Sequence, residues 1–408
     1  MQNYWLTDVR LETGYRYENG AVSGTETGLF HIRIANGKIA DIKAASAALE
    51  DTLPKKAMHG RLMLPSFRDM HIHLDKTYYG GPWKAPSVPA NGIFTRFEEE
   101  RELLPRLLPV ARERAGKLIE LLLRAGTTRI RSHVNIDPVI GLRNLEETLK
   151  AAEDYRDRAE IELVAFPQHG LLGGQTVSMM REALRNGASL VGGVDPATVD
   201  GDIEKSLCTI MDLAVEADAD IDIHLHDGGH LGLFTIQRLA DLTEQAGWQK
   251  RVTVSHALAL ADLTPETAAE TADRLAQLGI SIASSVPLGR TIPIPLLQAR
   301  GVEVMLGDDS IMDHWSPFGK GDMLEKAGIL AERFGLSSER ALGQSLRYIT
   351  GGITPLNGEG EQAWPRIGDE ASAVLVEASC SAEAVARRSK RQAVLLRGNL
   401  VSGSLDPK

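Results

Sequence analysis

The sequence has few cysteines and no long apolar run. Cys208 and Cys380 are its only cysteines among 408 residues, so neither a disulfide framework nor a Cys-x-x-Cys zinc site is available. No stretch approaches the ~20 apolar residues that cross a bilayer, and the first residues lack the basic and apolar regions of a signal peptide. We therefore expect a reducing, cytoplasmic location and no membrane partner.

An excess of positive charge is also missing. The formal net charge is -10, and no Lys/Arg-rich stripe is present that could neutralise phosphates, which argues against a nucleic-acid partner. A hydrophobic content of 43% with 25% charged residues is that of an ordinary globular protein. We expect a small-molecule substrate and a homo-oligomer.

Short alternating apolar segments occupy both ends of the chain. Residues 30–34 and 38–42 flank the turn Ala35-Asn36-Gly37, and Asn-Gly is a strong hairpin signal. Residues 373–377 and 393–401 show the same pattern. We predict that residues 1–64 and 355–408 form one small β-sandwich domain.

The middle of the chain, residues 65–354, alternates strand-like and helix-like segments. The expected strands are at about 68–73, 128–134, 161–167, 190–195, 220–226, 252–256, 280–286 and 302–308. Eight strand–helix alternations predict a parallel (β/α)8 TIM barrel. An open doubly wound sheet is the alternative, weakened because no Gly-x-Gly-x-x-Gly follows any strand.

Potential metal ligands stand at the ends of several expected strands. His71-Ile72-His73 ends the first, and alternate strand residues point the same way. His224 ends the fifth strand, His256 the sixth, and Asp309 follows the eighth. In a barrel these ends share one face, where active sites lie. Scattered ligands would thus meet in one centre.

The ordered set resembles the amidohydrolase superfamily, and within it the branch of cytosine deaminase and N-isopropylammelide isopropylaminohydrolase. The matching segments are His71–Lys76, Phe166–Gln168, Leu190–Thr198, Asp222–Asp227, Val254–Ala257 and Asp313–Gly319. The family's ligand aspartate lies six residues before a tryptophan, which assigns Asp309 by counting back from Trp315. Asp308 would then be a strand-end residue facing the next loop.

The resemblance implies one divalent metal ion bound by His71, His73, His224 and Asp309. Binuclear members carry a bridging lysine on strand four, and residues 188–198 contain no lysine. Histidine nitrogens with one carboxylate suit Zn²⁺, with Fe²⁺ and Mn²⁺ as alternatives. Such an ion lowers the pKa of water and supplies hydroxide at neutral pH.

The resemblance also implies catalytic roles. Asp309 would accept the proton of the attacking water, and His256 would orient that water. Asp227 occupies the slot of the deaminase proton-shuttle glutamate, a departure that favours the triazine branch over strict cytosine deaminase. His226 would face the same interior as acid or base, or else be a supporting histidine hydrogen-bonded to a carboxylate.

Gln168, Lys76 and Trp315 are the expected substrate-binding residues. The Gln168 amide suits a ring N–C=O edge, Lys76 would bind substrate charge, and Trp315 would stack on a flat ring. A salt bridge to Asp75 and ordinary core packing are the alternatives for Lys76 and Trp315. His133 and His169 are candidate pocket-lining residues.

Other polar residues receive structural assignments. His31, His59 and His230 are expected to be structural or exposed, and the charge run Glu98–Glu102 to be a solvated helix start. The whole pattern predicts a hydrolase that releases ammonia or a small amine from a cytosine-like or aminotriazine ring. The alternatives are an N-alkyl-aminotriazine amine hydrolase, a cyclic-amide hydrolase and a non-catalytic metal-binding barrel.

Overall fold

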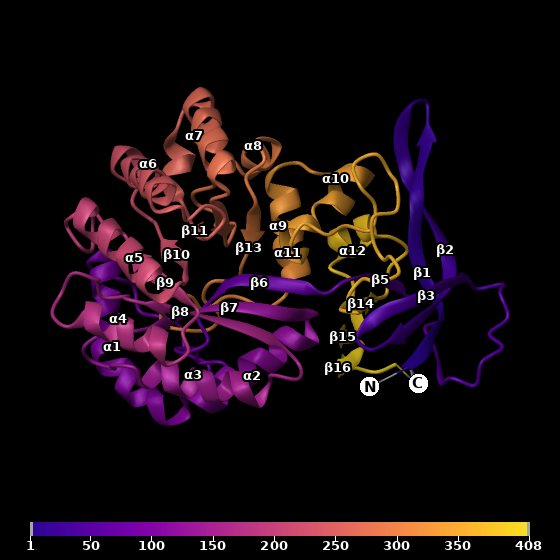
Figure 1. Cartoon of the computed structure of the whole chain (residues 1–408), viewed down its shortest axis with the longest axis horizontal. Helices are drawn as coiled ribbons and strands as arrows, with labels where there is room; N and C mark the ends of the chain where they lie inside the picture. The colour runs from indigo at the N-terminus through magenta and orange to yellow at the C-terminus, as the bar shows by residue number, and fades with distance from the viewer. Residues whose placement is uncertain (1–2, 406–408) are drawn as a thin grey trace.

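The computed structural model describes residues 3–405 and contains two sheets of eight strands each. Figure 1 shows the larger unit, a barrel surrounded by helices, beside a smaller unit whose strands come from the indigo and yellow ends of the chain. Among the helices of residues 3–405, none combines the length and apolar composition needed to span a membrane.

The barrel sheet has the strand order β13-β12-β11-β10-β9-β8-β7-β6, and its paired strands run parallel. Its strands are β6 (Phe67–Ile72), β7 (Thr127–Asn135), β8 (Glu160–Phe166), β9 (Leu190–Val194), β10 (Asp220–His224), β11 (Val252–Ser255), β12 (Ser281–Ser284) and β13 (Val304–Leu306). The predicted (β/α)8 barrel is confirmed. The last two strands are shorter than expected.

The barrel closes between β6 and the segment after β13. The Asp309 amide donates to the His71 carbonyl at 2.7 Å, and the His73 amide donates to the Asp309 carbonyl at 3.2 Å. Gly307 lies at this seam, where a Cβ would stand 2.5 Å from the His71 carbonyl oxygen. Only glycine allows so close an approach, so backbone sterics bring candidate ligands of the first and last strands together.

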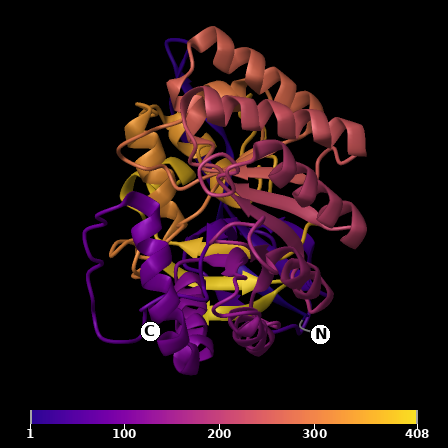
Figure 2. The ribbon, with the colours of Figure 1, turned by 90° about the vertical axis from the view of Figure 1, so that its left-hand side faces the viewer.

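Helices cover the outside of the barrel (Figure 2). They are α2 (Ala111–Arg124), α3 (Arg143–Asp154), α4 (Thr176–Arg185), α5 (Ile203–Ala217), α6 (Gly229–Ala246), the 3-10 turn η2 (Leu258–Asp262), α7 (Pro265–Leu278), α8 (Ile294–Ala299), α9 (Met323–Arg333), α10 (Glu339–Gln344) and α11 (Arg347–Thr350). On α2, Ala115, Leu118, Ile119 and Leu122 are fully buried, the spacing of a helix with one core-facing side.

One helix begins earlier than the sequence indicated, because the helix start expected at Glu98–Glu102 lies inside it. α1 (Gly92–Leu107) precedes the 3-10 turn η1 (Leu108–Val110), which separates it from α2. Pro109 lies in this turn and cannot donate a helical hydrogen bond. The apolar periodicity of the sequence also predicts one helix over Leu107–Arg124, and this prediction is wrong at its start, because α2 begins only at Ala111.

The second sheet joins both ends of the chain. Its strands are β1 (Asn3–Glu18), β2 (Ala21–Ala35), β3 (Lys38–Ala44), β4 (Lys55–Ala57), β5 (Leu62–Pro65), β14 (Ala373–Val376), β15 (Arg391–Leu396) and β16 (Asn399–Gly403), with helix α12 (Ser381–Arg387) between β14 and β15. β14 pairs antiparallel with β5. Leu6, Ile32, Leu375 and Leu395 belong to a core separate from that of the barrel. The boundaries at residues 64 and 355 remain our proposal.

Candidate metal centre and active site

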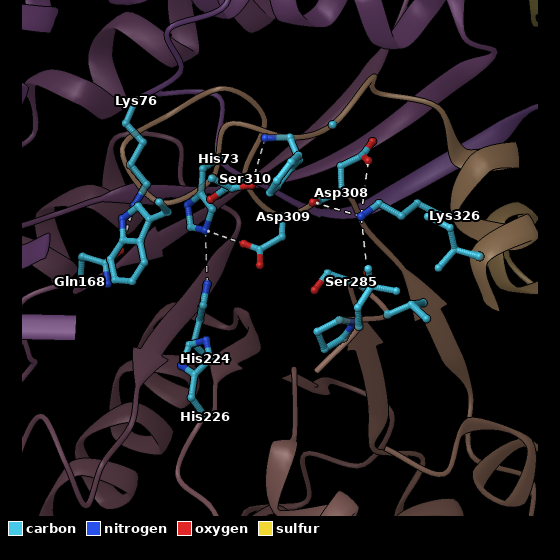
Figure 3. Close-up of a pocket in the computed structure, with 18 residues that line it drawn as sticks. His73, Lys76, Gln168, His224, His226, Ser285, Asp308, Asp309, Ser310 and Lys326 are labelled. Carbon is cyan, nitrogen blue, oxygen red and sulfur yellow. Dashed lines mark hydrogen bonds and ion pairs between the residues drawn. The ribbon is translucent and has the colours of Figure 1, made fainter. Parts of the chain in front are cut away.

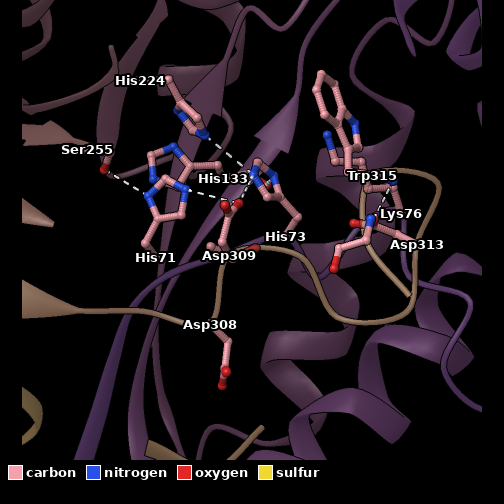
Figure 4. A network of polar contacts seen from close by, with 12 residues as sticks. His71, His73, Lys76, His133, His224, Ser255, Asp308, Asp309, Asp313 and Trp315 are labelled. Atoms are coloured by element: carbon pink, nitrogen blue, oxygen red, sulfur yellow. Dashed lines mark hydrogen bonds and ion pairs between the residues drawn. The ribbon is translucent and has the colours of Figure 1, made fainter. Parts of the chain in front are cut away.

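Metal-ligating side chains converge at the carboxyl ends of the barrel strands, and Figure 4 shows His71, His73, His224 and Asp309 pointing toward one another. His71 and His73 come from the end of β6, His224 ends β10, and His256 and Asp309 follow β11 and β13. Asp309 Oδ1 lies 3.6 Å from Nε2 of both His71 and His73, and Nε2 of His224 lies 3.4 Å from Nε2 of His73. The structure thus brings the predicted ligand residues together.

Hydrogen bonds on the far side of two rings orient them toward this centre. Ser255 Oγ lies 2.7 Å from His71 Nδ1 and donates to Asp222 at 2.6 Å. Arg131 donates to the other Asp222 oxygen at 3.1 Å. His73 Nδ1 lies 3.2 Å from the His133 carbonyl. Because both Nδ1 atoms are engaged, both Nε2 atoms are left for the centre, the arrangement of metal-binding histidines.

The charge states of these side chains suit a metal ion. Burial lowers the pKa of His73, His224 and His256 well below the usual range, which favours neutral rings at these positions. Burial alone would raise the pKa of Asp309, but the surrounding histidines, His256 foremost, hold it well below its usual range. Neutral imidazoles with an ionised carboxylate are the forms that bind metals.

Buried nitrogens without partners support the same interpretation. Within residues 3–405, His71 Nε2, His224 Nδ1 and His256 Nε2 are buried and have no hydrogen-bond partner. Ligand atoms of His71, His256 and Asp309 lie within 4.8 Å of one another, as do those of His71, His133 and His224. The cluster could therefore hold a metal ion. The His133 ring packs against the rings of His71 and His224, with centroid distances of 4.3 and 4.4 Å, and His133 is not among the residues that line the pocket, as the sequence suggested it would be.

The backbone is strained at two of these positions. His256 and Asp309 have φ angles of 68° and 66°, in the left-handed region that non-glycine residues rarely adopt. Such conformations persist only where the surrounding structure holds them, and they cluster at functional sites.

A pocket of about 530 Å³ opens beside the cluster (Figure 3). Its polar half is formed by Lys76, Gln168, His226 and Trp315 together with His73, His224 and Asp309. Val286, Pro287, Leu288, Phe318 and Ile329 also line the pocket, and Asp308 and Lys326 lie on the side opposite Gln168 (Figure 3). The volume is within the range of small-molecule sites.

His226 and Asp227 diverge although they are neighbours. His226 lines the pocket, and its Nδ1 lies 2.8 Å from the Asp195 carboxylate. Burial would lower the pKa of His226, but the hydrogen bond to Asp195 raises it. Asp227 instead accepts hydrogen bonds from the Thr198 hydroxyl and, at 3.1 Å, from the Ala197 amide. The structure therefore does not bring Asp227 to the pocket wall.

Lys76 is fully engaged on the polar side of the pocket. Its ammonium donates to Gln168 Oε1 at 2.8 Å and to Glu100 and Asn135 at 3.3 Å each. Glu100, rather than the alternative Asp75, is its salt-bridge partner. Asp75 accepts hydrogen bonds from the Asn135 amide and Asn144.

The prediction that the charge run Glu98–Glu102 is exposed to solvent is wrong for Glu100, whose side chain is 0% exposed. Burial would raise the pKa of Glu100, but Lys76 and two histidine donors hold it well below its usual range. His169 donates to Glu100 and is not on the pocket wall. The sequence carried no clear sign of this role, because Glu100 stands among exposed acidic neighbours.

Asp308 lies on the pocket wall apart from the histidine nitrogens. Its carboxylate is 3.7 Å from the Lys326 ammonium, and its amide donates to buried Asp69 at 3.1 Å. Burial raises the pKa of both carboxyls. Of the remaining histidines, His31 is buried beside the Asp8 amide, and His59 and His230 are exposed, as expected.

Comparison with known proteins shows the family of the chain. Residues 58–403 match the sequence pattern of the amidohydrolase family. The chain belongs to the amidohydrolase family. It is 47% identical to the uncharacterized protein YahJ of Escherichia coli, over 99% of this chain and 88% of that protein. It is 31% identical to N-isopropylammelide isopropyl amidohydrolase of Pseudomonas sp., over 97% of both chains.

A solved structure agrees with the fold of this amidohydrolase. N-isopropylammelide isopropylaminohydrolase from Burkholderia multivorans superposes with a TM-score of 0.87 at 30% identity, covering 100% of both chains. The resemblance inferred from the motifs is thereby confirmed, as is the prediction of a hydrolase.

Proposed function

We propose that this amidohydrolase is a hydrolytic deaminase that removes ammonia or a small amine from an N-heterocycle, using one divalent metal ion held by His71, His73, His224 and Asp309. The convergence of these four side chains beside a small-molecule pocket carries the proposal. An ion bound there would supply Lewis-acid activation of water. Zn²⁺ suits the donor set, with Fe²⁺ and Mn²⁺ as alternatives.

The residues around the centre fit the proton transfers that hydrolysis needs. Asp309 remains ionised and would accept the proton of the attacking water. His256, with a free buried Nε2 among the described residues, would orient that water. His226 is held by Asp195 and faces the pocket, so it would deliver a proton to the leaving amine. We assign this step to His226 rather than Asp227 because only His226 lines the pocket.

The shape of the pocket favours an N-alkylamine as the leaving group. Val286, Pro287, Leu288 and Ile329 supply apolar side chains to the lining of the pocket, and an alkyl substituent buried against them gains about 0.8 kcal/mol per methylene. A relative with 31% identity is named for an N-isopropyl substrate. We therefore place N-alkyl-aminotriazines ahead of cytosine-like rings, with Trp315 stacking on the ring.

The proposal is tested by a screen of the purified, metal-loaded protein for ammonia or alkylamine release from aminopyrimidines and N-alkyl-aminotriazines. Elemental analysis should find one divalent metal ion per chain. Asp309→Asn should nearly abolish turnover and metal binding together, whereas His256→Asn should reduce the rate by ~10²–10⁴-fold with less loss of metal. Two metal ions per chain, or full activity in either variant, would contradict the assigned roles.

A further inference from the structure

Glu100 connects several loops of the polar half of the pocket without lining the pocket itself. Its buried carboxylate accepts five hydrogen bonds from side chains. The donors are Lys76 at 3.3 Å, His314 at 2.8 Å and Trp315 at 3.1 Å on one oxygen, and Asn135 at 2.9 Å and His169 at 2.9 Å on the other. These donors come from four different segments around the barrel mouth, all tied to one residue of α1.

The contact between Lys76 and Gln168 fixes the orientation of the Gln168 amide. A lysine ammonium has three donors and no acceptor, so the amide atom 2.8 Å from Lys76 Nζ must be the oxygen. The other two ammonium hydrogens are directed to Glu100 and Asn135. Asn135 is itself fixed, because its NH₂ donates to Glu100. Lys76 therefore cannot turn away while Glu100 is ionised.

As a consequence, the Gln168 amide offers its NH₂ group, a hydrogen-bond donor, to a substrate. Its oxygen accepts a hydrogen bond from Lys76, whereas no residue among 3–405 accepts one from its NH₂ group. Because Gln168 lines the pocket (Figure 3), this NH₂ group is available to a substrate. A substrate edge that offers a hydrogen-bond acceptor can pair with this donor. An edge that offers an N–H donor meets another donor and leaves both groups unpaired, which is costly in a buried site.

We propose that Glu100 is a positioning residue that determines specificity: through Lys76 it holds Gln168 as a donor, so that the site selects rings with a carbonyl oxygen at this edge over rings with an amino group. The choice of a heterocyclic ring rests on the proposed function. The Glu100 carboxylate accepts hydrogen bonds from five donors, whereas the amide in Glu100→Gln has a single oxygen. Lys76 would lose its charged partner, and the Gln168 amide could then turn.

The test compares an N-alkylamino-triazine carrying carbonyls at its other two ring carbons with the same ring carrying amino groups there. The wild-type protein should prefer the carbonyl ring by about 10- to 100-fold in kcat/KM and in Kd from calorimetry. Glu100→Gln should bring this ratio toward one, mainly through KM, with metal content unchanged. Glu99→Gln is the matched control, because Glu99 pairs with Arg96 at 2.7 Å on the same helix, and it should keep the wild-type ratio.

A second pair of variants covers a Glu100→Gln protein that does not fold. Gln168→Glu should reverse the preference, since one carboxylate oxygen would bind Lys76 and the other would face the pocket as an acceptor. Gln168→Leu, which removes the amide and leaves Glu100 unchanged, should abolish the preference.

Equal binding of both rings by the wild type, or an unchanged ratio in folded Glu100→Gln, would overturn the inference. Preferential binding of the carbonyl ring without any turnover would support the inference while contradicting the proposed function, because the calorimetric measurement does not depend on activity.

Discussion

Replacing Ser255 by alanine should weaken metal binding without removing any ligand. The Ser255 hydroxyl donates its one hydrogen to Asp222 at 2.6 Å. Burial raises the pKa of the Asp222 carboxyl, but the Arg131 guanidinium on its other oxygen opposes this rise and favours the ionised acceptor. The hydroxyl must then accept from His71 Nδ1, 2.7 Å away. His71 therefore carries its proton on Nδ1 and keeps the Nε2 lone pair free.

Ser255→Ala removes the acceptor that selects this tautomer. Loss of such a supporting partner typically costs 10- to 100-fold in metal affinity, which corresponds to about 1.4–2.8 kcal/mol. Competition with a chromogenic chelator would measure the dissociation constant. The variant should also unfold more easily, since Asp222 loses a buried donor, at a cost of about 1–3 kcal/mol.

Ser206→Ala provides a matched control for the loss of stability. Ser206 is also 0% exposed, and its hydroxyl donates to Asp200 at 2.6 Å on the outside of the barrel. It should lower stability by a similar amount and leave metal affinity unchanged. If Ser255→Ala binds metal as tightly as the wild type, or if both variants weaken it equally, the tautomer argument is wrong.

Two further pairs of variants test the choice of proton donor and the close approach at Gly307. His226→Asn should lower kcat by ~10²–10⁴-fold, whereas Asp227→Asn should act mainly on stability, because its carboxylate binds the backbone of a loop; equal losses of kcat would contradict our choice of proton donor. Gly307→Ala should lower the melting temperature and the metal content together, at a cost of about 1–3 kcal/mol, because its Cβ would stand 2.5 Å from a backbone oxygen. Gly173→Ala, with open space around it, should change neither, and a fully metal-loaded Gly307→Ala would refute the role of the close approach.

The sequence predicted the barrel and the candidate ligands because both can be read from the succession of strands and helices along the chain. A ligand at the end of a parallel strand is placed by the barrel itself, whatever its distance along the chain. The hydrogen bonds that orient these ligands depend instead on which side chains of different strands lie next to one another. Asp222 lies two residues before His224, and this spacing could have indicated that both point into the barrel.

Glu100 could not be found in the same way. Its helix has charged residues on much of its surface, and nothing in the run Glu98–Glu102 distinguishes the one carboxylate that docks against the barrel mouth. Its burial is decided by the loops that carry Lys76 and Trp315, which come from opposite ends of the barrel sequence. Such a contact is tertiary and leaves no periodic pattern.

The seam between β6 and the Asp309 segment also affects how the protein matures. Ile72 and Asp309 form the bridge that completes the barrel, and contacts between residues so distant in the chain are slow to form during folding. The ligands from the two sides meet only when this seam is closed. A metal ion bound by both would favour the closed barrel by mass action, so metal uptake would both report and stabilise closure of the barrel.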